Sequence, residues 1–208
     1  MSVAVMPLPE QSPLPFDPAK APAERYSLLV ASFPEPLQQV IAAGRLEQRP
    51  RFGENGFEGL QQIWSPPRTV SAREAGMALR VLSDLEASVL LPAEPDHQLG
   101  RVLALLSHFP AKGLTPDVEQ LVAMDWVEDL CEFPAWAIDD AARMWRRTKK
   151  WRPSIAEMRA LCEEACASER AMAQRLRQII SAFPGSTAGM RPAEVRQFPE
   201  GGPFRNRP

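Results

Sequence analysis

The side chains that most often carry out catalysis are scarce in this chain. Its 208 residues include two histidines, His97 and His108, one tyrosine and three cysteines. Nucleophilic and acid–base catalysis need a reactive group beside a correctly placed proton carrier. His97 stands near the expected start of a helix and His108 just before the expected end of one, which is typical of surface or capping residues. The sequence therefore predicts no catalytic residue, and we expect the protein not to be an enzyme.

The cysteines, carboxylates and glycines do not form a metal or cofactor site either. Cys162 and Cys166 are one helical turn apart, but no second Cys or His pair accompanies them to complete a zinc site. Asp139 and Asp140 are adjacent, so on a helix their side chains point in different directions. The glycine-rich segment 53–56 lacks the Gly-Lys-Ser/Thr of a phosphate-binding loop. We therefore predict no metal and no cofactor.

A dense group of cations near Trp145 is the strongest binding signal. The formal net charge of the chain is only −2, so an anion-binding surface must come from local segregation of charge. On a helix, Ile138, Ala141 and Trp145 share an apolar stripe, and the cations face away from it. The candidate partner- or nucleic-acid-binding residues are Arg143, Arg146, Arg147, Lys149, Lys150, Arg152 and Trp151.

Three explanations of this cationic group fit the sequence. The cations could meet phosphate backbones, with Trp151 stacking on bases. They could instead meet an acidic patch on a protein. In the third explanation, cations in the last turn of a helix complement its dipole, and both tryptophans belong to the core.

Helical periodicity and capping signals place these residues in a helical domain that spans residues 71–183. Ser71 and Glu74 have the form of a capping box at the start of the first helix, and Ser154 and Glu157 repeat that form near the end of the chain. Between them, Phe-Pro pairs at 109–110 and 133–134 end two helices. No alternation of period two persists along the chain. The fold class is therefore predicted to be all-α, a compact multi-helix domain.

The last helix is predicted to be long, covering residues 154–182. Its apolar positions alternate three and four residues apart, as in a coiled-coil seam, with Glu169 as the one polar member. This seam could lie partly on the core of its own chain, or it could pair with a second copy in a homodimer.

The two ends of the chain differ from the helical domain in composition. Six prolines lie within residues 1–22, which we predict to be a disordered Pro-rich arm. Residues 23–70 are predicted to hold short helices and a connector, in which Phe57, Leu60, Ile63 and Trp64 make one anchoring turn. Residues 184–208 are rich in Gly and Pro, and we expect a disordered tail.

The compartment follows from the cysteines and from the absence of targeting signals. An odd number of cysteines argues against a disulfide framework and favours a reducing environment. The N-terminus lacks the pattern of a signal peptide, and no stretch is apolar enough to span a membrane. We expect a cytoplasmic protein without a membrane partner.

Residues 97–165, and most closely Trp126 to Leu161, resemble a known group of proteins. The matching residues are Asp125-Trp126-x-x-Asp129-Leu130, Phe133-Pro134, Ala137-Ile138-x-x-Ala141, Trp145 with the basic run after it, and Trp151-x-Pro153-Ser154-Ile155-x-Glu157-Met158. This order is similar to small phage and prophage replication proteins, in particular the phage replicative helicase loader/inhibitor family. The resemblance implies a non-enzymatic adaptor that delivers or restrains a hexameric helicase.

The leading expectation is therefore a replication accessory protein that binds a replicative helicase or another replisome component. One alternative is a nucleic-acid-binding or DNA-packaging or regulatory protein that uses the basic helix 138–152. A second alternative is a small helical assembly protein that oligomerises through residues 154–182.

Overall fold

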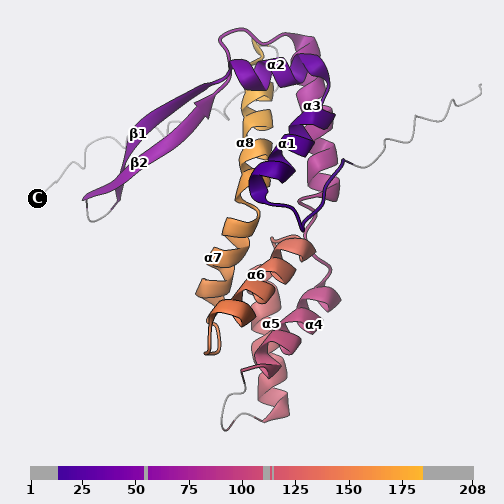
Figure 1. The fold of residues 1–208 in the computed structure, drawn as a ribbon, viewed down its shortest axis with the longest axis vertical. Coiled ribbons are helices and arrows are strands. Elements are labelled where there is room, and N and C mark those ends of the chain that lie inside the picture. Colours follow the sequence, from indigo (N-terminus) through magenta and orange to yellow (C-terminus); the bar gives the residue numbers. More distant parts are fainter. Residues whose placement is uncertain (1–13, 54–55, 110–112, 114, 185–208) are drawn as a thin grey trace, which may run out of the picture.

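The computed structural model describes residues 14–53, 56–109, 113 and 115–184 of the chain, and most of them are helical (Figure 1). The elements are α1 (Pro22–Ser32), α2 (Glu35–Ala43), β1 (Arg45–Gly53), β2 (Gly56–Ser65), α3 (Ala72–Ser88), α4 (Pro95–Ser107), α5 (Pro116–Leu130), α6 (Ala135–Thr148), α7 (Ile155–Ala165) and α8 (Ala167–Ala182). The prediction of a mainly helical domain is confirmed.

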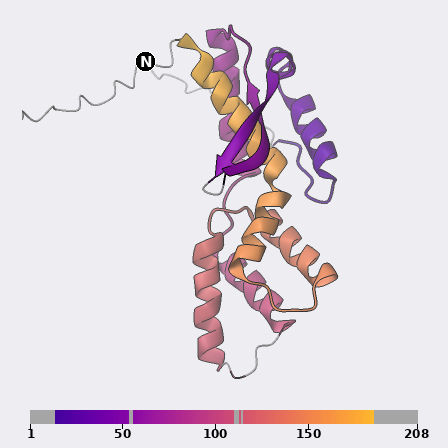
Figure 2. The ribbon, with the colours of Figure 1, turned by 90° about the vertical axis from the view of Figure 1, so that its left-hand side faces the viewer.

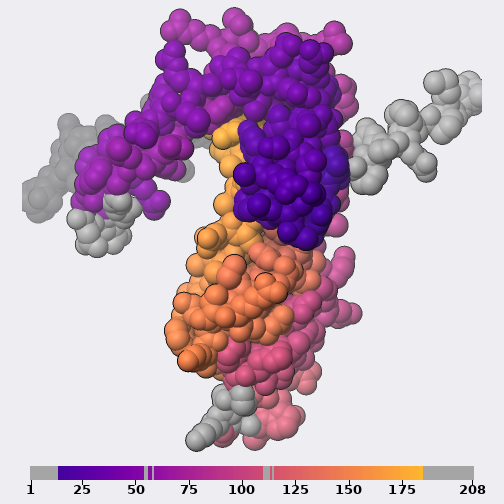
Figure 3. Space-filling model, viewed as in Figure 1, coloured from indigo at the N-terminus to yellow at the C-terminus, as the bar shows by residue number. Residues whose placement is uncertain are grey.

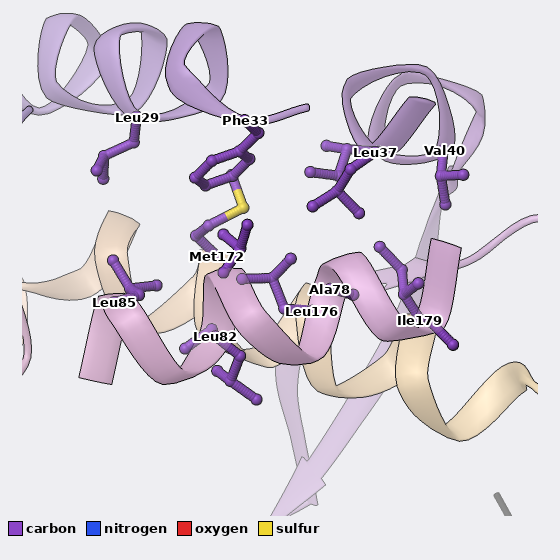
Figure 4. Packing of buried hydrophobic residues seen from close by; sticks show 14 of the residues in the cluster. Leu29, Phe33, Leu37, Val40, Ala78, Leu82, Leu85, Met172, Leu176 and Ile179 are labelled. Atoms are coloured by element: carbon purple, nitrogen blue, oxygen red, sulfur yellow. The ribbon is translucent and has the colours of Figure 1, made fainter. Parts of the chain in front are cut away.

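The helices form two hydrophobic clusters stacked along the long axis of the molecule (Figure 1, Figure 2). The α3/α8 cluster joins α1, α2, α3 and α8, and Figure 4 shows Leu29, Phe33 and Leu37 facing Met172 and Leu176 across it. The α5/α6 cluster joins α4, α5, α6 and α7. Leu90 and Trp136 pack against both clusters, so the two cores meet rather than forming separate domains.

Two capping boxes start helices where the sequence predicts them. The Ser71 amide donates to Glu74 at 2.7 Å and the Glu74 amide donates to the Ser71 hydroxyl at 3.3 Å. The Ser154 amide donates to Glu157 at 2.8 Å, and the Glu157 amide donates back to the Ser154 hydroxyl at 3.3 Å. Each box satisfies two amides that a helix start leaves without partners.

These boxes predict a contribution to acid sensitivity. Hydrogen bonds from the Ser71 and Ser154 amides hold the pKa values of Glu74 and Glu157 below the ordinary 4.5. The stabilisation is therefore present above that ordinary value and is lost as the pH falls through the lowered values. We expect a Glu157→Gln variant to lose less stability than the parent protein between about pH 6 and pH 3, measured by denaturant unfolding at each pH. Identical pH slopes for variant and parent would contradict this assignment.

The predicted long helix 154–182 is wrong in one respect, because it is interrupted at Cys166. Cys166 has φ −102° and ψ 11°, outside the helical region, and its thiol donates to the Cys162 carbonyl at 3.0 Å. The interruption divides the apolar seam between the clusters: Met158 and Cys162 belong to the α5/α6 cluster, and Met172 belongs to the α3/α8 cluster.

The seam of residues 154–182 is consequently used within the chain. Met158, Cys162, Met172, Leu176 and Ile179 are fully buried against other helices of the same molecule. A homodimer that pairs this seam with a second copy would have to open both cores. The apolar seam of residues 154–182 is therefore not exposed for pairing with a second copy in the described structure.

The chain is not all-α, because residues 45–65 form an antiparallel β-hairpin instead of a connector. Its register pairs Leu46 with Trp64 and Phe52 with Phe57, with a bulge after Arg51. The anchoring turn predicted between Phe57 and Trp64 is strand β2. The sequence carries the signal as alternating charges at positions 47, 49 and 51, followed by Asn-Gly, the commonest dipeptide of tight hairpins. Pro50 and three glycines obscure the alternation.

The root of the hairpin is fixed to the α3/α8 cluster by Trp64. Its ring is buried and packs so closely over Gly44 that a Cβ atom there would stand 2.2 Å from the indole. Glycine is therefore required at the end of α2, where the chain turns into β1. Beyond this root the hairpin leaves the body of the molecule (Figure 1).

The predicted disordered arm, residues 1–22, needs correction over its last part. Leu14 and Phe16 pack against the α3/α8 cluster, and the Phe16 ring lies 5.0 Å from that of Trp136. The apolar side chains between the prolines make this packing favourable. Residues 1–13 of the predicted arm and residues 185–208 of the predicted tail lie outside the described residues.

Candidate binding surface at the end of helix α6

The apolar stripe predicted for α6 is confirmed and fixes which way its cations face. Ile138, Ala141, Ala142 and Trp145 are all buried in the α5/α6 cluster. Upstream, Phe133 is fully buried and its carbonyl accepts from the Ala93 amide at 3.0 Å. Since α6 is held along this whole side, its basic residues lie on the opposite, outer side.

The two tryptophans after α6 have different environments. Trp145 is buried and its indole donates to the Trp151 carbonyl at 2.9 Å, which fixes the loop that follows the helix. Trp151 is 54% exposed, and its ring meets Trp145 edge to face at a centroid distance of 6.1 Å. The explanation that places both rings in the core therefore holds for Trp145 alone. Trp151 presents an ordered aromatic surface to the outside.

Three of the predicted site residues have internal partners. Arg143 pairs with Asp140 at 3.1 Å, one turn earlier on α6. Arg152 is half-buried, lies 3.6 Å from Glu119 on α5 and donates to the Phe109 carbonyl at 3.4 Å. The Lys149 ammonium lies 5.3 Å from the centre of the Trp151 ring and 5.8 Å from that of Trp145. Arg152 therefore serves mainly to hold the loop against α4 and α5.

Arg146, Arg147 and Lys150 are left without an acidic partner among the residues that the structure describes. Arg147 and Lys150 are exposed and Arg146 is half-buried. Arg146 and Arg147 lie in the last turn of α6, and Lys150 follows in the loop just after the helix ends at Thr148. We call these three cations together with Trp151 the basic end. It combines unpaired positive charge with an aromatic ring on a rigid support.

A hollow of about 720 Å³ lies beside the basic end, between the segment before α1 and helices α6 and α7. Its lining is mixed: Lys20, Arg143 and Lys149 contribute positive charge, and Met144 and Leu161 contribute apolar surface. Asp140 and Glu164 also line it. A hollow of this composition suits amphipathic side chains of a partner better than a single small anion.

His97 and Asp139 have structural partners. Asp139 accepts from the Arg101 guanidinium at 2.6 Å and lies 3.2 Å from the His97 imidazole, so this group ties α4 to the start of α6. Within the described ranges, no three or more His, Cys, Asp or Glu side chains are arranged to hold a metal ion. Likewise, no helix in those ranges has the length and apolarity needed to cross a membrane.

Cys162 and Cys166 occupy the core. Both are fully buried, and burial raises the pKa of the Cys162 thiol to about 12 and also raises the pKa of Cys166. Because the thiolate is the reactive form of cysteine, both thiols are protonated and unreactive at neutral pH. Cys131, at the end of α5, is exposed.

This difference predicts the reactivity of the three thiols. In the native protein we expect one thiol, Cys131, to react rapidly with a thiol reagent at neutral pH. All three should react after unfolding in denaturant, as counted by mass spectrometry of the labelled protein. A Cys131→Ser variant provides the control and should label only when unfolded. Rapid native labelling of Cys162 or Cys166 would contradict the buried assignment.

Comparisons of the chain with protein-family models, with curated proteins and with solved structures found no match. Function must therefore be argued from the residues and their geometry.

Two features of the structure, one that bears on stability and one on binding, were not predicted from the sequence. The first is a buried ion pair between Arg25 and Glu169, joined at 2.8 Å. Glu169 was visible in the sequence as the polar member of an apolar seam, but nothing in the sequence indicated Arg25 as its partner. The second is the outer part of the hairpin, with exposed Phe52 and Phe57.

Proposed function

We propose that the protein is a non-enzymatic adaptor of a replication system, which binds a ring-shaped replicative helicase or another replisome component. The observation that carries the proposal is the basic end, at the last turn of α6 and in the loop after it: three cations with no acidic partner among the described residues, beside one exposed tryptophan. Such a surface is suited to binding another macromolecule. The resemblance of residues 126–161 to helicase loaders suggests which kind.

The residues that carry this resemblance support a common scaffold. Phe133, Trp145 and Pro153 are buried in or against one cluster, and Ser154 and Glu157 start α7 beside it. Motif residues of this kind define how a four-helix unit is built. The residues of the basic end do not take part in this packing, so they are available to bind the partner.

The outer side of α5 favours a protein over a nucleic acid as the partner of this unit. Val118, Leu121 and Met124 are exposed there, on a helix that is apolar on its inner side as well. Asp117 and Asp125 are exposed on the same helix. Exposed apolar side chains beside carboxylates are typical of protein-binding surfaces, whereas the carboxylates would repel phosphates.

A second candidate function, binding to single-stranded nucleic acid, is favoured by Trp151. An exposed ring flanked by Arg147 and Lys150 has the combination of stacking surface and positive charge that such binding uses. This surface is small, so the binding would be weak and would fall steeply with salt.

Two binding measurements separate these candidates. The adaptor proposal predicts that the full chain co-purifies with the replicative helicase encoded in the same phage or mobile element at physiological salt. Nucleic-acid binding predicts a shift in the fluorescence anisotropy of a labelled single-stranded oligonucleotide, lost with increasing salt. Oligonucleotide binding without helicase binding would replace the first candidate by the second.

A further inference from the structure

We propose that the β1–β2 hairpin is a dimerisation arm, whose apolar face packs against the same face of a second copy of this chain. This inference is independent of the proposed function and of the basic end. It rests on the composition of the two faces, on the way the arm stands clear of the body, and on a hollow at its root.

The two faces of the arm differ sharply. Residues paired in an antiparallel hairpin share a face, and successive residues alternate between faces. The pairs on one face are Leu46 with Trp64, Gln48 with Gln62, Pro50 with Leu60, and Phe52 with Phe57, none of them charged. The pairs on the other face include Arg45, Glu47, Arg49 and Arg51. The hairpin is therefore amphipathic, and beyond Trp64 at its root, which is buried against the α3/α8 cluster, its apolar face is exposed in the described structure.

The apolar face is exposed along most of its length. Leu46, Phe52, Phe57 and Leu60 are between 59% and 70% exposed, and the rings of Phe52 and Phe57 meet edge to face at a centroid distance of 5.9 Å. A two-stranded hairpin is at best marginally stable without packing on one face. Nine residues of β1 give an arm about 30 Å long, since each strand residue adds about 3.3 Å. Space-filling views show it standing off the helical body (Figure 3).

A hollow of about 430 Å³ lies at the root of the arm, against α8. Leu46 and Trp64 of the apolar face line it, as do Gln61 and Ile63 of the other face and Gln174, Arg175 and Gln178 of α8. The side-chain oxygen of Gln178 is buried and accepts no hydrogen bond from the described residues. The Arg175 guanidinium lies 5.8 Å from the Trp64 ring. Arg175 also donates to the Tyr26 hydroxyl at 2.6 Å, so the wall of the hollow on the α8 side is held in place by contacts within the chain.

A second copy of the chain can contact both the tip and the root of this arm. If two arms pack face to face and run in opposite directions, the Phe52 and Phe57 tip of each copy reaches the hollow at the root of the other. The arrangement is isologous, so one surface serves both partners. The residue pairs of the apolar face carry no charge and so bring no repulsion, and Arg45, Arg49 and Arg51 of the other face remain on the outside. Four large apolar side chains from each copy, with their polar neighbours, bury on the order of 1,200 Å², which is the lower limit for a stable interface.

The first test is the mass of the full-length protein in solution as a function of concentration. We expect sedimentation equilibrium to show a dimer by about 100 μM, where a micromolar Kd populates it. Phe52→Ser combined with Leu60→Ser should give a monomer with unchanged helical circular dichroism. The matched control, Arg49→Ser combined with Arg51→Ser on the opposite face, should remain dimeric. A monomeric parent protein at that concentration overturns the proposal, as does a dimer that survives the Phe52 and Leu60 substitutions.

The second test asks which face is at the twofold axis. Gln48 lies on the apolar face about halfway along the arm, so in a face-to-face dimer with antiparallel arms it is close to Gln48 of the second copy. Glu47 lies on the opposite face and points away from the second copy. In a Cys131→Ser background, Gln48→Cys should therefore form a disulfide-linked dimer under mild oxidation, and Glu47→Cys should not. Equal cross-linking at both positions, or cross-linking at position 47 alone, contradicts the face-to-face arrangement.

Discussion

Replacing Arg25 by alanine is expected to lower the free energy of unfolding by about 3–5 kcal/mol. Arg25 is 4% exposed and Glu169 is 0% exposed, so the substitution leaves a carboxylate buried without its cation. Removing one partner of a buried ion pair costs far more than the pair itself contributes, because the remaining charge has lost its water and gains nothing in return. The loss is comparable to a large part of the total stability of a domain of this size.

Several contacts beyond the ion pair converge on Arg25. Its guanidinium donates to the Ala165 carbonyl at 2.7 Å and to the Lys20 carbonyl at 3.1 Å, and it lies 5.0 Å from the centre of the Trp136 ring. These contacts join α1, the start of α6 and the interruption between α7 and α8. Arg25 therefore holds the two hydrophobic clusters together at their junction. The same substitution should make the two clusters unfold less cooperatively.

Denaturant unfolding, followed by circular dichroism and by tryptophan fluorescence, measures both effects. The matched control is Arg25→Met combined with Glu169→Leu, which removes both charges and retains most of the volume. We expect this double variant to be much closer to the parent protein than Arg25→Ala, since no unpaired charge remains. A loss below about 1 kcal/mol for Arg25→Ala, typical of an exposed pair, would contradict the burial of this group.

Reversing the charge of the basic end is expected to weaken partner binding by at least about 100-fold, because placing like charges together costs several kcal/mol. The variant is Arg146→Glu, Arg147→Glu and Lys150→Glu together. None of the three has an acidic partner in the part of the chain that the structure describes, so their replacement breaks no ion pair there and should retain the fold, with a loss of about 1–2 kcal/mol from the reversed charges in the last turn of α6. A loss of binding can then be assigned to the surface.

A matched control carries the same change in net charge elsewhere. Arg68, Arg73 and Arg80 are exposed in and before α3, away from α6, and can be replaced by glutamate together. Binding measured by biolayer interferometry should be retained by this control and lost by the basic-end variant. Equal losses of affinity in both variants would show that only the overall charge matters, and would contradict the assignment of binding to the basic end.

The structure also shows why some elements could be predicted from the sequence and others could not. Capping boxes at Ser71 and Ser154 and the stripe ending at Trp145 were predicted because their signals are local, within one or two turns of helix. The interruption at Cys166 has no such signal. It arises because the two halves of the seam are buried in different clusters, and that is decided by packing between distant segments.

The hairpin and the ion pair were missed for related reasons. Alternation in β1 is carried by charges on one face and interrupted by Pro50, so an apolar pattern of period two does not stand out. Arg25 and Glu169 are 144 residues apart in sequence, and only the fold brings them together. At the candidate site, the cationic group was predicted, and the pairing of Arg143 with Asp140 is local, but the partners of Arg152, Glu119 and the Phe109 carbonyl, lie far away in sequence.

The most direct test of the proposed function is the affinity of the chain for the purified ring-shaped replicative helicase from the same source. The proposal predicts a complex at physiological salt that the control at positions 68, 73 and 80 retains and the variant at positions 146, 147 and 150 loses. A helicase that the parent protein does not bind, or that the basic-end variant binds as tightly as the parent protein, would contradict it.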